Sequence, residues 1–264
     1  MCWYGNFTVT DNLLLTPDDF DPYCVTAPVD PRLPGGGGQQ ICGYYDLKPA
    51  KVGPTSNVVT RMSNYGDRSQ VYNGVDIGMH ARFGKGGLLS GGVSLGNTRS
   101  ENCVVVDSPQ QTLFCEMDNP QNQIKISGAY PLPWWGLQAS AVFQNVPGVA
   151  LNTTYAAPNA VILPTLGRNL GVCGASATCT TTQVVPLTES NTVFESRQTQ
   201  VDFRLSKTLQ FRRIRLRPRL DVYNLFNANS ATGVSTRYSP TTTYLRPNGI
   251  LAGRFFKFGA QVEF

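Results

Sequence analysis

The feature that most constrains the fold is a strict alternation of apolar and polar residues over segments of roughly ten residues. From Val71 to Phe83 the odd positions are apolar except for Asn73, and the even positions carry polar residues, glycine or tyrosine. Successive side chains of a β-strand point to opposite faces, so this period predicts a strand with one apolar and one polar face. The pattern recurs in six further segments, at residues 89–96, 124–130, 137–144, 198–206, 214–223 and 255–264. The sequence therefore predicts an all-β, antiparallel fold built from hairpins.

The connections between these segments alternate in length. Short connections are predicted at 84–87, 131–136 and 208–213, and long ones near 98–122, 146–194 and 226–248. Long strands joined by turns that are short at one edge and long at the other are typical of outer-membrane β-barrels, whose tilted strands have about ten residues. A soluble β-sandwich also alternates, but it rarely combines strands and turns in this way.

The composition excludes several classes of protein. Charged residues make up 15% of the chain, below the roughly 25% of ordinary soluble domains. The 26 glycines and 18 prolines disfavour a helical bundle or a coiled coil. The sequence contains no apolar run of the length a transmembrane helix needs, and its first residues lack the basic start and apolar stretch of a signal peptide. A net charge of +5 is too weak to indicate nucleic-acid binding.

The seven cysteines indicate an oxidising compartment. No CxxC pair is present and His80 is the single histidine, so zinc sites and Cys/His catalysis lack the residues they need. Six cysteines are neighbours along the chain within predicted loops. We expect three local disulfides, Cys24–Cys42, Cys103–Cys115 and Cys173–Cys179, with Cys2 left over.

The third hairpin carries the candidate lumen charges, which alternate with apolar residues: Asp202, Arg204, Arg215, Arg217, Arg219 and Asp221. Such charges fit the wet lumen of a barrel, although a solvated sheet face explains them equally well. With a turn at Gln210 to Arg213, we expect Asp202 to lie opposite or diagonal to Arg219, and Asp221 near Gln200. The aromatic residues Tyr130, Trp134 and Trp135 at one short turn suggest an interfacial girdle, with ordinary turn packing as the alternative.

Other motifs predict no chemistry. Gly35–Gly38 lacks the Lys-Ser/Thr pair of a phosphate loop, and Asp18, Asp19 and Asp21 lack the spacing of a calcium loop. No spacing selects two carboxylates for glycoside hydrolysis. We therefore expect neither an enzyme nor a cofactor.

Two stretches resemble a known family. Arg254–Phe264 resembles the closing strand of an outer-membrane barrel, with its terminal phenylalanine. Leu220–Asn227 is similar to the D-x-x-N-L-F-N penultimate strand of TonB-dependent receptors. Further stretches resemble distal loops of large Oar-like receptors with a carboxypeptidase-regulatory-like N-terminal domain: Thr10–Leu13, Ala27–Pro34, Gly43–Leu47 and Val71–Asp76.

The resemblance implies a barrel of about 22 strands in the cell outer membrane, with a plug that the TonB complex pulls to admit a bulky nutrient. It also implies that the barrel-assembly machinery reads one face of the last strand, at Phe256, Phe258, Ala260, Val262 and Phe264. About seven or eight strands cannot enclose so large a pore, and the plug and TonB box are missing. We therefore expect the C-terminal part of a longer receptor, with residues 1–70 mostly an extracellular loop and residues 71–264 the last strands of the barrel. The alternative is a secreted, disulfide-containing β-rich binding or adhesion domain.

Overall fold

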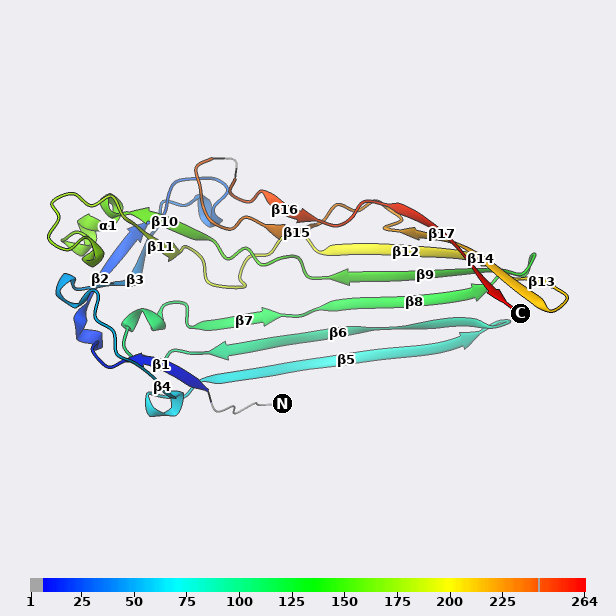
Figure 1. The fold of residues 1–264 in the computed structure, drawn as a ribbon, viewed down its shortest axis with the longest axis horizontal. Helices are drawn as coiled ribbons and strands as arrows, with labels where there is room; N and C mark the ends of the chain where they lie inside the picture. The colour runs from blue at the N-terminus through cyan, green and yellow to red at the C-terminus, as the bar shows by residue number, and fades with distance from the viewer. Residues whose placement is uncertain (1–6, 242) are drawn as a thin grey trace.

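The computed structural model describes residues 7–241 and 243–264, and it is mostly antiparallel β-sheet. Strands account for 52% of the described residues, which contain one α-helix, so the predicted all-β class is confirmed. None of the helices in these residues has the length and hydropathy to cross a membrane. Figure 1 shows an elongated molecule in which one long sheet carries a compact group of short elements at one end.

The long sheet has seven rows of strands. They are β5 (Ser69–Phe83), β6 (Gly87–Glu101), β8 (Gln123–Pro131), β9 (Leu137–Val146), β12 (Gln198–Lys207), β14 (Ile214–Tyr223) and β17 (Phe255–Glu263). Two shorter strands extend these rows, because β7 (Glu116–Pro120) also pairs with β6, and β13 (Leu209–Phe211) also pairs with β14. All neighbouring rows are antiparallel.

The sheet is open in the described part of the chain. Strand β5 pairs only with β6, and β17 pairs only with β14, so the two edges do not meet. Both edges present backbone donors and acceptors that a further strand would satisfy.

Short and long connections lie at opposite ends of the sheet, as expected from the sequence (Figure 1). The short ones are residues 84–86, 132–136 and 212–213, and the C-terminus lies at the same end. Gly84 and Gly86 have φ of 55° and 105°, conformations that glycine adopts without steric cost. This arrangement sends every long connection to the other end.

The long connections are structured. Four small antiparallel sheets pair β1 (Thr8–Asn12) with β4 (Asn57–Arg61), β2 (Phe20–Thr26) with β3 (Gln40–Leu47), β10 (Thr154–Pro158) with β11 (Thr182–Pro186), and β15 (Ala231–Val234) with β16 (Pro247–Ile250). The described part of residues 1–70, which were expected to be mostly loop, thus contains the four strands β1 to β4 and the start of β5. Helix α1 (Asn159–Leu166) packs on β2 and ends at Gly167, whose φ of 77° is left-handed.

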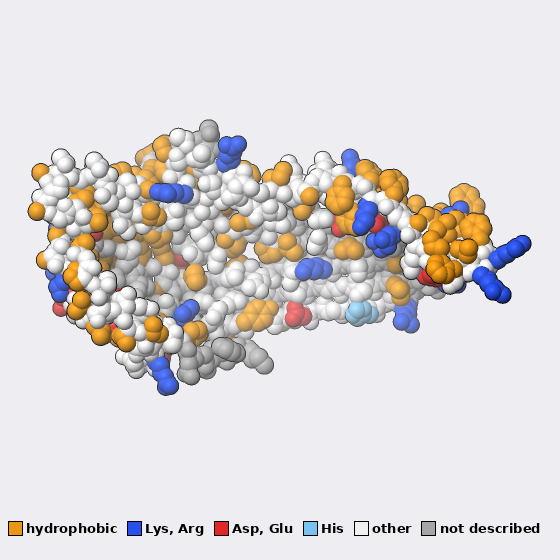
Figure 2. Space-filling view, viewed as in Figure 1, with side chains coloured by type: hydrophobic (Ala, Val, Ile, Leu, Met, Phe, Trp, Pro, Cys, Tyr) orange, Lys and Arg blue, Asp and Glu red, His pale blue; other side chains and the backbone are white. Residues whose placement is uncertain are grey.

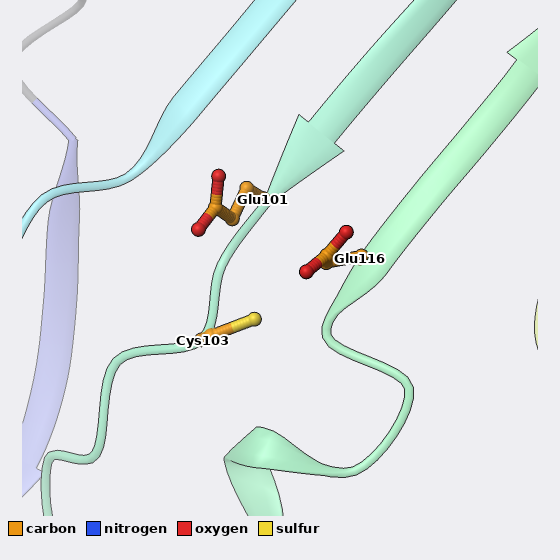
Figure 3. A group of neighbouring side chains, drawn as sticks. All are labelled: Glu101, Cys103 and Glu116. Atoms are coloured by element: carbon orange, nitrogen blue, oxygen red, sulfur yellow. The ribbon is translucent and has the colours of Figure 1, made fainter.

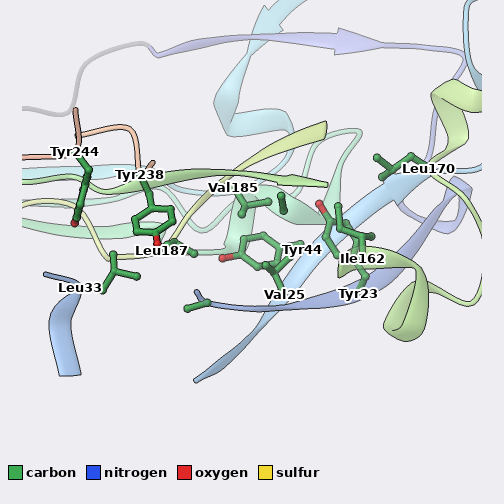
Figure 4. Close-up of a cluster of buried hydrophobic side chains, with 12 residues drawn as sticks. Tyr23, Val25, Leu33, Tyr44, Ile162, Leu170, Val185, Leu187, Tyr238 and Tyr244 are labelled. Atoms are coloured by element: carbon green, nitrogen blue, oxygen red, sulfur yellow. The ribbon is translucent and has the colours of Figure 1, made fainter. Parts of the chain in front are cut away.

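The buried core lies outside the long sheet. We call residues 20–47, 154–187, 238–241 and 243–245, which include β2, β3, β10, β11 and α1, the cap, because they share one apolar cluster (Figure 4). Its members are Tyr23, Val25, Ala27, Leu33, Tyr44, Ala157, Ile162, Leu170, Val185, Leu187, Tyr238 and Tyr244. Full burial of one large apolar side chain stabilises a fold by about 1.5–3 kcal/mol, so this cluster holds together segments far apart in sequence.

Candidate functional site

One face of the long sheet is apolar from β5 to β17. The strand register places Ile77 opposite Val93, Val93 opposite Ile124, and Leu220 opposite Phe258. Ile77 is 62% exposed and Phe258 is 79% exposed, so the described chain does not cover this face. Contiguous apolar patches larger than a few hundred Å² on a soluble protein mark a membrane or protein contact. The apolar face is therefore the first candidate for function.

The apolar band has a defined height. On the side of the long connections, the last apolar residue of four rows is followed on the same face by a polar one: Asn97, Asn122, Asn145 and Thr199. On β17 the band runs from Phe256 to Phe264, about 27 Å along the strand at ~3.4 Å per residue. A strand tilt of about 40° reduces this to about 20 Å, close to the ~25 Å apolar band of outer-membrane barrels.

Aromatic residues border the band at the short connections. Phe83 and Tyr130 stack with ring centroids 5.7 Å apart, and Trp134 and Trp135 are exposed in the turn between β8 and β9. Figure 2 shows hydrophobic side chains gathered over this end of the molecule. Exposed aromatic rings at such a border suit a membrane interface, where one part of the ring is apolar and the other is wet.

The opposite face of the sheet holds all six of the charged residues expected on one face of the third hairpin. Arg204 lies opposite Asp221, Ser206 opposite Arg219, and Arg215 opposite Glu263. The Nε of Arg204 donates to Oδ1 of Asp221, while Oδ1 of Asp202 accepts the backbone N–H of Asn224 at 2.8 Å. Arg215 and Arg217 lie 3.4 and 3.7 Å from Glu263.

The pairing expected within this hairpin was wrong. Asp202 does not face Arg219, and Asp221 faces Arg204 instead of lying near Gln200. The cause is the turn, which contains only Arg212 and Arg213 between β13 and β14. Because this turn is centred further along the chain than expected, each residue of β12 pairs with a different residue of β14. Its side chain nevertheless stays on the expected face of the sheet.

The polar face is cationic along its last three rows. Five cations, Arg204, Arg215, Arg217, Arg219 and Lys257, share it with three acids, Asp202, Asp221 and Glu263. A hollow of about 210 Å³ lies beside Arg204 and Tyr223, between β9, β12 and β14. This face can receive a polar or acidic surface.

The residues of the closing strand lie on the apolar face. Phe256, Phe258, Ala260 and Val262 are opposite Val222, Leu220, Pro218 and Leu216 of β14. Phe264 follows the strand and is fully exposed. Because β17 is an edge of the described sheet, its apolar residues and its unpaired backbone lie together.

The D-x-x-N-L-F-N stretch forms a corner between β14 and β17. Asn224 is buried with φ of 49°, and its side chain bonds Ala228 through both amide atoms and also the carbonyl of Ala252, each at 2.8 Å. Oδ1 of Asn227 accepts the backbone N–H of Arg254 at 2.9 Å. The two asparagines thus fix where β14 ends and where β17 begins. The sequence showed the motif but not this structural role.

The three expected disulfides are present. Cys24–Cys42 joins β2 to β3, Cys103–Cys115 joins the segments after β6 and before β7, and Cys173–Cys179 closes a short loop after α1. All three lie at the end of the long connections. The leftover cysteine, Cys2, is outside the described residues.

Ion pairs join separate segments of the cap. Arg168 bonds Asp21 of β2 at 2.8 Å and Asp46 of β3 at 2.5 Å. Arg32 donates to the carbonyl of Ser239 at 3.2 Å, and its hydrogen bonds to the neighbouring Asp30, the shortest 2.6 Å, lower the pKa of Asp30 to about 2. Burial raises the pKa of Tyr44 to about 12, and its hydroxyl donates to the carbonyl of Pro186 at 2.5 Å.

The acidic stretch considered for calcium is engaged with cations. Lys51 lies 3.1 Å from Asp19, and Arg168 holds Asp21. Hydrogen bonds from the Thr16 backbone and from Lys51 lower the pKa of Asp19. These two carboxylates therefore stabilise the loop before β2.

Glu101, Cys103 and Glu116 form a cluster that does not suit a metal ion (Figure 3). The sulfur of Cys103 is bonded to Cys115 and cannot act as a thiolate ligand. Glu116 also lies 2.7 Å from Arg99. The remaining potential ligands are two exposed carboxylates, and one of them is already paired with an arginine.

His80 lies on the polar face of β5, where its Nδ1 is 2.9 Å from Oγ of Ser90. The nearest acid on the same face of that strand is Asp76, about 13 Å away at four residue steps. This spacing does not assemble a Ser-His-Asp triad, whose members must lie within hydrogen-bond reach of one another.

No protein-family model matches this chain, and no curated protein matches its sequence. The resemblance to TonB-dependent receptors therefore rests on the motifs of the chain itself.

Proposed function

We propose that this chain forms part of the wall of an outer-membrane β-barrel receptor that takes up a bulky nutrient. The observation that carries the proposal is the one-sided long sheet, whose uncovered apolar face has a height near that of the apolar band of outer-membrane barrels. Lipid against this face removes the cost of exposing it to water, and the charged opposite face lines a wet interior.

The open edges support a barrel with more strands than these seven. A row of unpaired backbone groups is tolerated in a membrane only when another strand satisfies it. Additional strands would join β5 to β17, and the lumen of such a larger barrel would have room for a plug domain. The cationic polar face of β12, β14 and β17 would contact the plug or the ligand.

The cap supports a receptor role at the outside of the membrane. It is held by a buried core and two disulfides, and disulfides form in an oxidising compartment such as the periplasm or the cell surface. Loops of this kind capture the ligand, and the TonB complex, acting through the plug, would open the lumen. The chain's own role is mechanical and structural, without a chemical step.

Uptake tests the proposal as a whole. Cells lacking the gene, and cells with an inactive TonB complex, would be grown on a medium containing nutrients too large for general porins. Mass spectrometry of the spent medium should show the same compounds left behind by both strains and removed by the wild type. Loss of uptake in the first strain alone would contradict coupling to TonB, and normal depletion in that strain would contradict a receptor.

Partition into detergent separates this proposal from a secreted binding domain. A barrel wall remains in the membrane pellet and enters the detergent phase. Recovery of the wild-type chain in the aqueous phase would contradict the proposal and support the secreted domain.

A further inference from the structure

An arginine lies on the apolar side of the sheet just beyond the apolar band. Arg197 precedes β12, and its Nε donates to Oδ1 of Asn145 at 2.6 Å while Nη2 donates to the carbonyl of Asn122 at 2.6 Å. Nδ2 of Asn145 donates to Oγ1 of Thr199, also at 2.6 Å. Thr199 shares its face with Val201, so these contacts place Arg197 above the apolar band.

The charge of Arg197 is not compensated. Among the described residues, no carboxylate oxygen lies within ion-pair distance of its guanidinium, and its three acceptors, two oxygens of Asn145 and the carbonyl of Asn122, are neutral. Arg99, on the same face of β6, differs because it bonds Glu116 at 2.7 Å. A guanidinium held at one side by neutral oxygens still presents N–H groups in the planar fork that binds phosphate.

Arg197 also lines a hollow. The space has a volume of about 170 Å³, and Phe194, Pro147 and Glu195 form other parts of its wall. It is therefore partly apolar, and it opens at the border between the apolar band and the long connections.

The height of the guanidinium matches the headgroup layer of a membrane. It contacts Asn145, which lies one alternation step beyond Phe143 of the apolar band. One step is about 6.6 Å along a strand, or about 5 Å along the membrane normal at a tilt of about 40°. The polar layer on each side of the hydrocarbon is about 5–8 Å thick.

We propose that Arg197, oriented by Asn145 and Asn122, binds the phosphate group of an anionic lipid in the leaflet next to the cap. The inference rests on the proposed function, because it requires lipid against the apolar band. The occupant is a lipid phosphate because the hollow adjoins the apolar face, where acyl chains pack against Phe143 and Val201. Glu195 weakens the attraction by its charge, so its removal strengthens binding.

Native mass spectrometry of the detergent-extracted protein tests the site. The protein is titrated with dioleoyl phosphatidic acid and with dioleoyl phosphatidylcholine, which have the same acyl chains. We expect the wild type to bind phosphatidic acid roughly tenfold more tightly, the ratio expected for one charge-assisted contact. Arg197→Gln should abolish the preference, Arg197→Lys should retain part of it, and Glu195→Gln should increase it.

The matched control is Arg212→Gln, which removes an exposed arginine from a short turn at the other end of the sheet and should leave the preference unchanged. Equal affinities for the two lipids in the wild type, or an unchanged preference in Arg197→Gln, would overturn the site. Displacement of phosphatidic acid by an equal concentration of inorganic phosphate would contradict a lipid as the occupant and would indicate that the site binds a soluble anion. These outcomes would contradict the lipid site but not the proposed barrel. Recovery of the wild type without detergent would instead contradict the proposed function itself.

Discussion

Arg204 of β12 lies directly opposite Asp221 of β14, and its Nε donates to Oδ1 of that carboxylate. The Asp221 side chain is almost fully buried, while that of Arg204 is about half exposed. Arg219 is the next cation, 3.9 Å from the same carboxylate. This pair fixes the register of the third hairpin, because a shift by two residues on either strand would separate the two charges.

Removing one member of the pair should destabilise the hairpin. Arg204→Gln leaves the buried carboxylate with Arg219, 3.9 Å away, as its remaining cation, and we expect a loss of about 1–2 kcal/mol, reduced from the value for a fully buried pair by Arg219 and by the exposure of Arg204. The midpoint of urea unfolding in detergent measures the loss. In a double-mutant cycle with Asp221→Asn, additive effects would show that the two side chains do not interact.

The Asn224 corner should be sensitive to substitution. Asn224→Ala removes three hydrogen bonds and places alanine at a left-handed φ of 49°, so we expect a loss of about 2–4 kcal/mol. The same unfolding measurement applies. Asn229→Ala, an exposed asparagine in the same connection, is the control. Equal stability of the two variants would count against a structural role for the corner.

The two cap disulfides should contribute unequally to the stability of the cap. Cys24 and Cys42 are separated by 18 residues and Cys173 and Cys179 by 6, which corresponds to about 3 and about 2 kcal/mol in the chain-entropy model. Double Cys→Ser variants of each pair are compared by hydrogen exchange of β2 and β3. We expect faster exchange mainly after loss of Cys24–Cys42. A larger effect from the Cys173–Cys179 variant would show that loop length does not govern cap stability.

The cap should lose stability in acid through Asp30. Its folded pKa of about 2 lies below the ordinary value of 3.8, so its contribution is complete above about pH 4 and is lost as the pH falls toward 2. Protease resistance of the cap should therefore fall over this range. Asp30→Asn should reduce resistance at pH 6 and flatten this part of the profile. A variant with the wild-type profile would exclude Asp30 as the titrating group.

Much of the sheet was predictable because alternation depends only on the period of the strand. The strands, the faces of Arg204 and Asp221, and the one-sided distribution of short turns followed from that period. The partner of Asp221 did not, because the register depends on a turn whose two residues, Arg212 and Arg213, carry no glycine signal. The cap core was also missed, since Tyr44, Ile162 and Tyr238 come from segments without regular periodicity and meet only in three dimensions.

Accessibility of neighbouring residues on a central strand tests most directly whether the apolar face contacts lipid. Ile126 and Lys125 of β8 are adjacent in sequence and lie on opposite faces. Each is replaced by cysteine in a Cys2→Ser background, and intact outer membranes are treated with a lipid-soluble or a membrane-impermeant maleimide. We expect Ile126→Cys to react only with the lipid-soluble reagent and Lys125→Cys to react with the impermeant one. Reaction of Ile126→Cys with the impermeant reagent would contradict the account.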